Sequence, residues 1–552
     1  MSRERQVRDE MKSTMMHTQL NLAHFLERAG KLYGKQEIVS RMPDKSLHRY
    51  TYADFYRRAR LLAEALTRAG MKRGDRVATL MWNHYAHYES YFGAIVAGGV
   101  LHTLNLRLAP DDIAFIADHA GDRFLIVDDI LLPLFEQFRD KVKLDRVIVV
   151  SLTGKPAPEG MDDYEAFLGT ATGEFEYPEM DENEPCAMCY TSGTTGRPKG
   201  VVYSHRSQVL HSLVQAIPDA CNLSGRDVLL PVVPMFHANA WGIPYTAAML
   251  GVKMVFPGPH LHPDDLLPLL ESEKVTLSCG VPTIWLPMAQ IIGKNPEKWK
   301  LQPNLRLTVG GAAVPEAMIR AYAKLGIEIM QGWGMTETSP LATVSQITAQ
   351  QQQLNEDARF RIQAMQGYPL PLVDLRGIDD DGSETAWDGK SVGEIQVHGP
   401  WITGNYHGVP VSSENFSDDG WLRTGDVACI DELGFMKITD RTKDLIKSGG
   451  EWISSVDLEN AIMGHPSVQE AAVIAVPHPK WSERPLAVIT LKPGEQAGEG
   501  DIRAYLAKQF VKWMVPDAYV FVDSIPRTST GKFLKTALRD QYRDWNWDKA
   551  AG

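Results

Sequence analysis

The stretch Tyr190-Thr-Ser-Gly-Thr-Thr-Gly-Arg-Pro-Lys-Gly200 is the most informative part of this sequence. It combines three glycines, four aliphatic hydroxyl groups and two cations in eleven residues. Glycine lets backbone amides turn toward one point, and hydroxyl groups with a lysine can then surround an anion. The stretch therefore predicts a phosphate-holding loop, although such a composition is equally typical of a plain strand-to-helix turn. It differs from the NTPase P-loop because Pro198 precedes Lys199 and Gly200 follows it.

Strand and helix patterns alternate around this loop. Thr51 is a helix cap in front of a helix that places Phe55, Ala59, Leu62 and Leu66 on one face. Short apolar runs at 76–81, 123–127, 228–233 and 306–310 predict buried strands. Helices are expected over 88–97 and from Pro110. This alternation favours helices packed on largely parallel sheets. Ligands usually bind where such strands end, and both the phosphate loop and residues 310–315 occupy that position.

The last part of the chain has a different pattern. After a polar stretch at 378–390, alternating segments at 393–398 and 435–438 predict antiparallel strands, which we interpret as a small β-barrel. A new unit begins near Asp440, with a helix expected at 457–463 and strands at 471–476 and 486–491. The prediction is an α/β protein. Its large N-terminal domain, residues 1–439, holds doubly wound sheets and the small barrel, and a small α+β domain covers residues 440–552.

Composition excludes several classes of protein. The chain has 552 residues, 44% of them hydrophobic, and a net charge of 57 minus 69, or −12. A negative charge argues against nucleic acid as the main partner. Residues 1–10 are charged and lack a signal core, and the best apolar run, 91–104, is too short to span a bilayer. We expect a cytoplasmic enzyme with small-molecule substrates and no transmembrane segment.

The cysteines and histidines predict no metal or redox centre. Five cysteines in a chain of this length indicate a reduced compartment. Cys186 and Cys189 have the spacing of a redox motif, but they lie in an apolar run that enters the phosphate loop, so we interpret them as strand residues. The pairs His205/His211 and His260/His262 lack further ligands nearby, which argues against a structural zinc.

Four further motifs follow the phosphate loop in order: Gln331-Gly-Trp-Gly-Met-Thr-Glu-Thr338, Gly420-Trp-Leu-Arg-Thr-Gly-Asp426, Thr439-Asp-Arg-Thr-Lys-Asp444 and Pro526-Arg-Thr-Ser-Thr-Gly-Lys532. Together with the loop, they resemble the adenylate-forming superfamily of acyl-CoA synthetases, luciferases and peptide-synthetase adenylation domains. The resemblance covers nearly the whole chain. Segments 233–241 and 447–455 are most similar to medium- and long-chain fatty acyl-CoA synthetases. No single motif would carry this assignment alone.

The resemblance implies a nucleotide site for ATP and AMP. Thr191 and Glu337 would position Mg²⁺, a hard cation that takes oxygen ligands. Thr336 and Glu337 would act in catalysis, although this pair alone is equally typical of a helix cap. The implied nucleotide-binding residues are Thr191, Ser192, Gly193, Thr194, Thr195, Gly196, Lys199, Gly311, Gln331, Gly332, Thr336, Asp426, Arg441, Lys443, Lys447 and Trp452.

Two further residues are catalytic candidates by resemblance. A lysine in a Ser/Thr/Gly loop is usually a solvated charge, but the resemblance implies that Lys532 reaches the carboxylate and the α-phosphate during adenylation. A lone histidine in an apolar stretch is usually a core residue, whereas the resemblance places His237 beside the acyl carboxylate. Coenzyme A must later approach the same anhydride, so the small domain is expected to be mobile and to rotate about a hinge at Asp440.

The acyl group and coenzyme A need their own sites. Trp241 fits an aromatic gate to an acyl tunnel, with a core tryptophan as the alternative. Val281 would line the tunnel wall, and Gly334 would leave the acyl pocket open where acetate-specific relatives carry tryptophan. Lys443, Lys447 and Trp452 would lie near the nucleotide or the coenzyme A path, although they are also compatible with a plain amphipathic surface.

The sequence thus predicts an ATP- and Mg²⁺-dependent fatty acid–CoA ligase, which forms acyl-AMP and then acyl-CoA, and which we expect to be a homodimer. One alternative is a ligase for another small acid, such as the thioether acid 3-methylmercaptopropionate. A peptide-synthetase module is less favoured because little chain follows Lys532. Another alternative is a nucleotide-binding scaffold without chemistry, against which Lys532, Glu337 and Asp426 argue.

Overall fold

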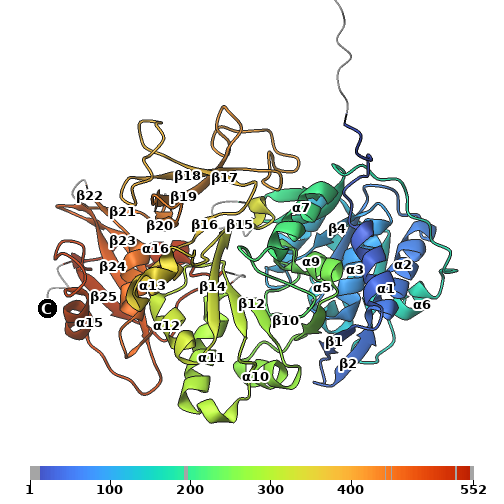
Figure 1. Ribbon diagram of the computed structural model, residues 1–552, viewed down its shortest axis with the longest axis horizontal. Coiled ribbons are helices and arrows are strands. Elements are labelled where there is room, and N and C mark those ends of the chain that lie inside the picture. The colour runs from blue at the N-terminus through green and yellow to red at the C-terminus, as the bar shows by residue number, and fades with distance from the viewer. Residues whose placement is uncertain (1–12, 192–196, 442, 449–450, 529–530, 548–552) are drawn as a thin grey trace, which may run out of the picture.

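The computed structural model describes residues 13–191, 197–441, 443–448, 451–528 and 531–547. Two large sheets form most of the molecule, with the seven-stranded sheet at the right of Figure 1 and the nine-stranded sheet at its centre. A four-stranded sheet lies at the top, slightly left of the centre, and the C-terminal unit lies at the left. The predicted α/β class, with a large mixed-sheet part and a small C-terminal domain, is confirmed.

The seven-stranded sheet carries the phosphate loop at one edge. Its order is β7-β6-β5-β3-β4-β8-β9, and every pairing is parallel except that of β8 with β9. The loop joins those last two strands. The strands are β3 (Arg76–Leu80), β4 (Val100–Thr103), β5 (Asp122–Asp128), β6 (Arg146–Val150), β7 (Asp162–Asp163), β8 (Pro185–Tyr190) and β9 (Gly200–Ser204).

The nine-stranded sheet has a parallel centre and antiparallel edges, in the order β16-β15-β14-β13-β12-β10-β11-β1-β2. The strands predicted at 228–233 and 306–310 are its members β10 and β13. The bounds are β1 (Glu37–Arg41), β2 (Leu47–Thr51), β10 (Val228–Pro231), β11 (Lys253–Phe256), β12 (Leu277–Gly280), β13 (Arg306–Val309), β14 (Glu328–Gly334), β15 (Leu341–Val344) and β16 (Tyr368–Pro369).

The helices of this part begin largely where the sequence places them. Thr51 caps α2 in a capping box with Asp54, and the four predicted apolar positions are fully buried. The α-helices are α1 (Ala23–Tyr33), α2 (Tyr52–Arg68), α3 (Tyr85–Val96), α4 (Pro110–Ala120), α5 (Leu132–Phe135), α6 (Tyr164–Leu168), α7 (His205–Ala216), α8 (Ala238–Trp241), α9 (Ile243–Leu250), α10 (Pro263–Ser272), α11 (Pro282–Lys294), α12 (Glu316–Lys324) and α13 (Glu356–Gln363), with 3₁₀ turns at η1 (Asp129–Leu131), η2 (Arg139–Lys141), η3 (Pro296–Lys298), η4 (Thr336–Thr338) and η5 (Gln351–Gln353).

One core cluster joins the two large sheets. It contains Leu101 of the seven-stranded sheet, Met254 of the nine-stranded sheet and the aromatic side chains of α3 between them. Polar contacts cross the same region: Arg58 on α2 donates to the fully buried carboxylate of Glu89 on α3 at 2.7 Å, and Tyr164 donates to it at 2.7 Å. This shared core fixes the relative position of the two sheets.

The expected barrel is instead an open antiparallel sheet in the order β17-β18-β19-β20. A barrel would require its two outer strands to pair. The outer edge of β20 is occupied, because the backbone of Met436 exchanges hydrogen bonds with Gln366 and Gly367 beside the nine-stranded sheet. The sheet is therefore continued toward its neighbour. Its strands are β17 (Asp374–Ile378), β18 (Val392–His398), β19 (Leu422–Ile430) and β20 (Met436–Arg441).

The C-terminal unit is the expected small α+β domain. β24 pairs with β21, β23 and β25. The predicted domain boundary falls inside β20, and both this boundary and the mobility of the domain stay predictions. The elements are β21 (Ile446–Ser448), β22 (Glu451–Ile453), β23 (Val468–His478), β24 (Ser482–Leu491), β25 (Ala518–Phe521), α14 (Ser455–Met463), α15 (Glu499–Leu506) and α16 (Lys535–Gln541).

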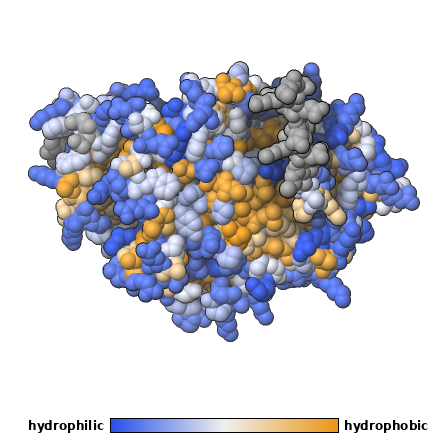
Figure 2. Space-filling model, turned by 45° about the horizontal axis from the view of Figure 1, so that its top comes forward, coloured by the Kyte–Doolittle hydropathy of each residue, from blue (hydrophilic) through white to orange (hydrophobic). Residues whose placement is uncertain are grey.

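The surface is mainly hydrophilic, with an apolar area near the middle of the face in Figure 2. In the described part of the chain, no helix has the length and apolar character needed to cross a membrane. Cys186 and Cys189 are buried in β8 with free thiols, which confirms that they are strand residues. No group of three or more candidate metal ligands occurs among the described residues.

Candidate functional site

The base of the phosphate loop is closed by hydrogen bonds. The amide of Thr191 donates to the carbonyl of Lys199 at 3.0 Å, and the amide of Lys199 donates to the hydroxyl of Thr191 at 3.0 Å. The predicted phosphate ligands Ser192, Gly193, Thr194, Thr195 and Gly196 lie outside the described residues. The two ends of the loop are thus held together where β8 ends and β9 begins.

A tyrosine connects the loop lysine to the predicted catalytic carboxylate. The ammonium of Lys199 lies 4.8 Å from the ring centre of Tyr406 and donates to Asn415 at 2.9 Å. The Tyr406 hydroxyl donates to Oε1 of Glu337 at 2.7 Å. Burial raises the pKa of Glu337. Tyr406 and Asn415 belong to none of the sequence motifs, and the sequence analysis missed both.

Thr336 lies in the same 3₁₀ turn as Glu337 and is also buried. Its carbonyl accepts from the Tyr203 hydroxyl at 2.8 Å, and the Glu337 carbonyl accepts from the amide of Thr403 at 2.8 Å. The turn is therefore fixed by its backbone, and the Glu337 carboxylate keeps its second oxygen beyond the bond from Tyr406.

Closely packed glycines lie where the adenine slot is predicted. A Cβ at Gly310 would lie 2.9 Å from the carbonyl oxygen of Gly332 and 3.5 Å from the ring of Trp241. Only glycine fits such an approach of two backbones. Gln331 holds the loop after Gly311, since its side-chain oxygen accepts from the amide of Val314 at 2.9 Å.

Asp426 receives hydrogen bonds from two sides. The indole of Trp333 donates to one oxygen at 2.8 Å, and Arg441 donates to the other at 3.1 Å. Asp426 and Arg441 face each other across β19 and β20. The negative charge of Asp426 is the main cause that raises the pKa of Arg441. A carboxylate has about four lone-pair sites, so this buried one can still accept from ribose hydroxyls.

Lys532 extends from the C-terminal unit into this site. The amide of Thr528 donates to the Lys532 carbonyl at 2.8 Å. The Lys532 Cε lies 3.9 Å from the Cβ position of Gly311. Burial, together with the positive charge of Arg441 and against the opposing charges of Asp426 and Glu337, lowers the pKa of Lys532 to about 8. The structure therefore brings the predicted catalytic lysine to the predicted nucleotide site.

The side chain of Val281 packs on both parts of this site. Its Cγ1 lies 3.3 Å from the Cβ position of Gly311, and its Cγ2 lies 3.7 Å from that of Gly531. Val281 thus supports the lysine loop, whereas its place in the acyl wall stays a prediction. His237 is half-buried nearby, and burial, with help from Lys532, lowers its pKa to about 4, so its ring is neutral at pH 7.

Gly334 has a structural reason to be glycine beyond the expected open pocket. Its ideal Cβ would lie 1.7 Å from the carbonyl oxygen of Pro340, where β14 forms a bulge against β15. A side chain at this position would point into backbone. The role of Gly334 in acyl selection stays a prediction.

The predicted coenzyme A residues lie on the C-terminal sheet. Lys447 and Trp452 face each other across β21 and β22, with the ammonium 4.9 Å from the indole ring. The Trp452 side chain is largely exposed, and Lys443 is exposed as well. Their function in a coenzyme A path stays a prediction.

Asp440 connects the four-stranded sheet to the C-terminal unit. One oxygen accepts from the amide of Ser455 at the start of α14 at 2.8 Å, and the other accepts from the amide of Arg441 at 2.9 Å. Lys535, three residues beyond Lys532, donates to the Ser455 hydroxyl at 2.5 Å and pairs with Glu459 at 2.7 Å. The predicted hinge residue therefore holds the orientation in which Lys532 enters the site.

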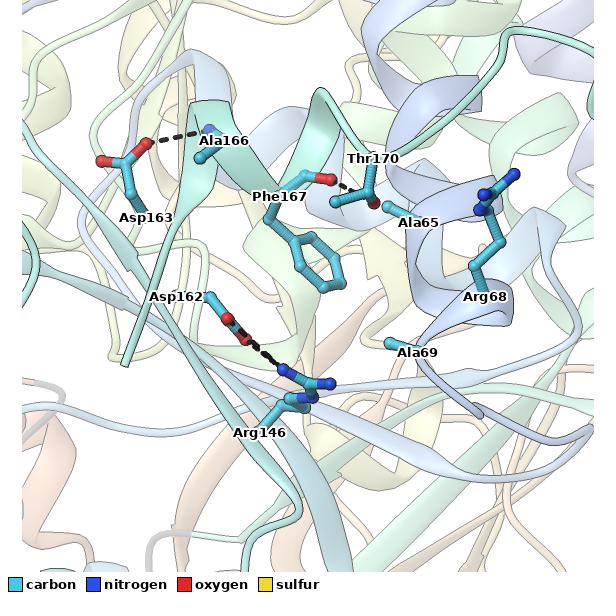
Figure 3. Close-up of a pocket in the computed structure, with 9 residues that line it drawn as sticks. All are labelled: Ala65, Arg68, Ala69, Arg146, Asp162, Asp163, Ala166, Phe167 and Thr170. Atoms are coloured by element: carbon cyan, nitrogen blue, oxygen red, sulfur yellow. Dashed lines mark hydrogen bonds and ion pairs between the residues drawn. The ribbon is translucent and has the colours of Figure 1, made fainter. Parts of the chain in front are cut away.

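A separate pocket lies on the seven-stranded sheet, with Arg146 and Asp162 paired at 3.3 Å. Figure 3 shows this pair below Phe167 and away from the side chains of Arg68 and Asp163. None of the predicted site residues lines it.

Comparison with known proteins places this geometry in a family. The AMP-binding enzyme family matches residues 26–407, and its C-terminal domain matches residues 457–532. A long-chain-fatty-acid–CoA ligase of Thermus thermophilus is 50% identical over 97% of both chains. A 3-methylmercaptopropionyl-CoA ligase of Ruegeria pomeroyi is 42% identical over 97% of this chain and 99% of its own.

The fold agrees with solved structures. A crystal structure of an anthranilate CoA ligase in complex with anthranoyl-AMP superposes with a TM-score of 0.85 at 24% identity, covering 97% of this chain and 99% of that one. At this identity the likeness shows the fold alone. The family match and the identity to the curated relatives lead to one conclusion. The chain belongs to the AMP-binding enzyme family, among the acyl-CoA ligases of the adenylate-forming superfamily.

Proposed function

We propose that this protein is an ATP-dependent fatty acid–CoA ligase for medium- or long-chain acids. The observation that carries the proposal is the position of Lys532, whose side chain reaches the glycine slot at Gly311 from the C-terminal unit. The charges of Asp426, Arg441 and Glu337 act on its pKa, which supports a reacting centre that these groups share. The 50% identity to a long-chain ligase supports the choice of acid.

The first step joins the acid to AMP. A carboxylate oxygen attacks the α-phosphorus of ATP, and the bond to the pyrophosphate oxygen breaks as pyrophosphate leaves. Negative charge gathers on the α-phosphate oxygens, and the Lys532 ammonium neutralises it in a low-dielectric site. The Asp426 carboxylate accepts from the ribose hydroxyls and thus fixes the nucleotide.

The second step transfers the acyl group to coenzyme A. The thiol sulfur attacks the acyl carbonyl carbon, the thiol loses its proton, and the bond to the AMP oxygen breaks. In the present arrangement Lys532 lies at the glycine slot, where we infer that it would stand beside this carbonyl. We infer that the C-terminal domain rotates about Asp440 between the two steps, a movement that a few dihedral angles can absorb.

The residues present fit a magnesium ion. Glu337 is a buried carboxylate whose pKa is raised by burial, so a nearby cation would stabilise its charged form. Mg²⁺ typically uses one or two protein oxygens together with substrate phosphates, and Thr191 and Glu337 would supply them. When bound, the ion would neutralise phosphate charge. The test is a titration of the protein with Mg²⁺ in the presence of ATP, with Glu337→Gln as the weakened variant.

The proposed activity is tested by two coupled measurements. Pyrophosphate release is followed for straight-chain acids of increasing length, with and without coenzyme A, and acyl-CoA is quantified. We expect acid-dependent pyrophosphate release and one acyl-CoA per AMP, with medium or long chains preferred. Absence of acid-dependent turnover in a folded protein would favour the nucleotide-binding scaffold and contradict the proposal.

A second candidate is a ligase for a thioether acid, which the 42% identity to a 3-methylmercaptopropionyl-CoA ligase favours. Including 3-methylmercaptopropionate in the same series decides between the two. A cytoplasmic location and a homodimer also stay predictions. Light scattering of the purified protein measures the oligomeric state directly.

A further inference from the structure

The inner face of α7 carries several buried polar side chains beside the core valines Val209 and Val214. Gln208, His211, Ser212 and Gln215 face inward and are each no more than 2% exposed, whereas Leu213 on the opposite face is 47% exposed. A helix normally turns its apolar stripe toward the core. The inner face of α7 is therefore mixed, and its buried polar side chains are the part that apolar packing does not explain.

Most of these inward groups lack partners. Within the described ranges of the chain, no hydrogen-bond partner is found for either amide atom of Gln208, for the hydroxyl of Ser212 or for Nδ1 of His211. Leaving a buried polar group unpaired is costly, so native proteins usually satisfy such groups with protein, water or ligand. Unpaired groups from one helix face therefore indicate a place where another molecule donates or accepts.

The unpaired side chains on this face of α7 carry no charge. Nε2 of His211 accepts from the amide of Leu341 at 3.2 Å, so the ring proton sits on Nδ1. Burial lowers the pKa of His211 to about 3, which keeps the ring uncharged at pH 7. This face therefore offers N–H donors from His211 and Gln208, the amide oxygen of Gln208 and the hydroxyl of Ser212. It offers no cation.

This polar face lies directly behind the proposed acyl gate. The side-chain amide of Gln215 donates to the carbonyl of Trp241 at 2.7 Å. The Cβ position of Gly242 lies 2.8 Å from Nδ1 of His211 and 3.7 Å from the side-chain oxygen of Gln208. The ring of Trp241 approaches Gly310 in the nucleotide slot, so the turn that contains Trp241 separates the reacting centre from the polar face.

The turn from Ala238 to Trp241, called the gate turn below, has an unusual backbone conformation. Four consecutive non-glycine residues have left-handed backbone: φ is 43° at Ala238, 50° at Asn239, 49° at Ala240 and 59° at Trp241. Each such residue is disfavoured relative to a right-handed turn, and strained backbone of this kind gathers at ligand clamps and switches. The gate turn lies next to the unpaired groups, and a rearrangement on entry of an acyl group would relieve its backbone strain.

We propose that Gln208, His211 and Ser212 form a hydrogen-bonding subsite behind Trp241 for a neutral oxygen substituent, a hydroxyl or keto group, on the acyl chain. The inference rests on the proposed acyl-CoA ligase function and narrows its substrate class. A second carboxylate is excluded as the occupant because the set has no cation to compensate a buried charge. A purely aliphatic chain would leave the donors and the acceptor unpaired.

The test compares matched acids. For the full-length enzyme, kcat/KM for acyl-CoA formation is measured with straight-chain acids and with hydroxy acids of equal length whose hydroxyl moves one carbon at a time. We expect one hydroxyl position at which the hydroxy acid equals or exceeds its parent acid. In Gln208→Leu, the ratio of hydroxy to parent kcat/KM at that position should fall about tenfold, because a hydrogen bond is lost while the pocket volume is kept.

Two further variants make the result specific. Ser212→Ala, a smaller change, should lower the same ratio in the same direction, and it serves if Gln208→Leu does not fold. Leu213→Gln lies on the opposite, exposed face of α7 and should leave the ratio unchanged.

The outcomes separate the two proposals. If the wild-type enzyme forms acyl-CoA from both series but the ratio is unchanged in Gln208→Leu and Ser212→Ala, buried water alone satisfies these groups and the subsite is refuted. If the wild-type enzyme forms acyl-CoA from no acid of either series, the proposed function fails and the subsite fails with it.

Discussion

Lys532 shows how a single residue depends on its surroundings. Its ammonium is most useful in a dry site, but burial disfavours the charged form and lowers its pKa to about 8. The carboxylates of Asp426 and Glu337 oppose the shift and help to keep the group charged near neutral pH.

This environment predicts the pH dependence of adenylation. The active form is the ammonium, which is present below the pKa and lost above it. The kcat/KM of acid-dependent pyrophosphate exchange should therefore fall as the pH rises through about 8. Thioester formation from preformed acyl-AMP should lack this decrease if, as proposed, Lys532 serves only adenylation. An exchange rate that stays level to about pH 9.5 would show that the lysine keeps its ordinary pKa.

Gly334 gives a second prediction at this scale. In Gly334→Ala the new Cβ would meet the carbonyl oxygen of Pro340, so the backbone must move. We expect a loss of about 2–4 kcal/mol in the free energy of unfolding, measured by denaturant titration. Gly293→Ala in α11 is the matched control, because no heavy atom lies within 4 Å of its Cβ position, and it should be neutral or slightly stabilising.

If Gly334→Ala were as stable as the wild type, the backbone here would be less tightly packed than the structure indicates. In that case the position would be free to control acyl length. Gly334→Trp would then be a meaningful probe of the pocket, whereas with the packing seen here its main effect would be on folding.

Local motifs of the sequence named residues that the structure places near one another, while their roles stay predictions. Lys532, Asp426 and Arg441 are brought together in the structure. Tyr406 was missed because its hydroxyl meets Glu337 across 69 residues of sequence, a contact that only tertiary packing creates. Gly334 was expected to leave space, whereas its neighbour Pro340 is a backbone contact that no spacing reveals.

Among the elements, β20 has two functions. It completes the four-stranded sheet, and its residue Asp440 binds the first turn of α14. Lys437 of the same strand pairs with Asp457 of α14 at 2.9 Å. One strand thus fixes the orientation of the C-terminal unit.

The charge of Asp440 should favour adenylation over thioester formation. Asp440→Asn keeps the shape but weakens the interaction with the Ser455 amide and Lys535, so the arrangement that holds Lys532 in the site becomes less populated. We expect pyrophosphate exchange to slow about tenfold, the effect of roughly 1.4 kcal/mol, with little change in thioester formation from acyl-AMP. Asp440→Pro would be less clear, because it removes the carboxylate as well as fixing φ.

The matched control for Asp440→Asn is Asp374→Asn, a largely exposed aspartate of β17 in the same sheet. It should change neither half-reaction. Equal slowing of both half-reactions in Asp440→Asn, with an unchanged melting temperature, would mean that the residue does not set the domain orientation.

The contact between α2 and α3 gives a stability prediction. Arg58→Met leaves the fully buried carboxylate of Glu89 with Tyr164 but without its cation. We expect the free energy of unfolding to fall by about 3–5 kcal/mol, the usual effect of removing one partner of a buried ion pair. Arg57→Met, on the exposed side of α2, should change it by less than about 0.5 kcal/mol. Similar small losses in both variants would show that Glu89 is not charged in the folded protein.

Elements were predicted well where local signals agree, as in α2 with its capping box and four apolar positions. The turn at Ala238 to Trp241 was not predictable, because left-handed backbone opposes the preference of all four residues and depends on surrounding contacts. The predicted barrel is an open sheet in the structure for a similar reason. The strand pattern specifies antiparallel pairing, but the partner at the edge of β20 comes from Gln366 and Gly367, far away in the sequence.

For the whole molecule, the site belongs to no single sheet. Tyr190 and Gly200 come from the seven-stranded sheet and Asp426 from the four-stranded sheet. Trp333 belongs to β14 of the nine-stranded sheet, and Gly310 directly follows its strand β13. Alternating patterns predicted sheets with helices on them. The strand order and the meeting of separate sheets at one point follow from long-range packing and could not be predicted from the pattern alone.

The central claim is that Lys532, supplied by the C-terminal unit, serves adenylation and not thioester formation. The most direct measurement is the pair of half-reaction rates of Lys532→Ala in a variant shown to be folded: acid-dependent pyrophosphate exchange, and acyl-CoA formation from preformed acyl-AMP. The account predicts that exchange falls by about 100-fold or more, because a preorganised charge is lost, while acyl-CoA formation stays close to the wild-type rate. Parallel loss of both rates would contradict the account.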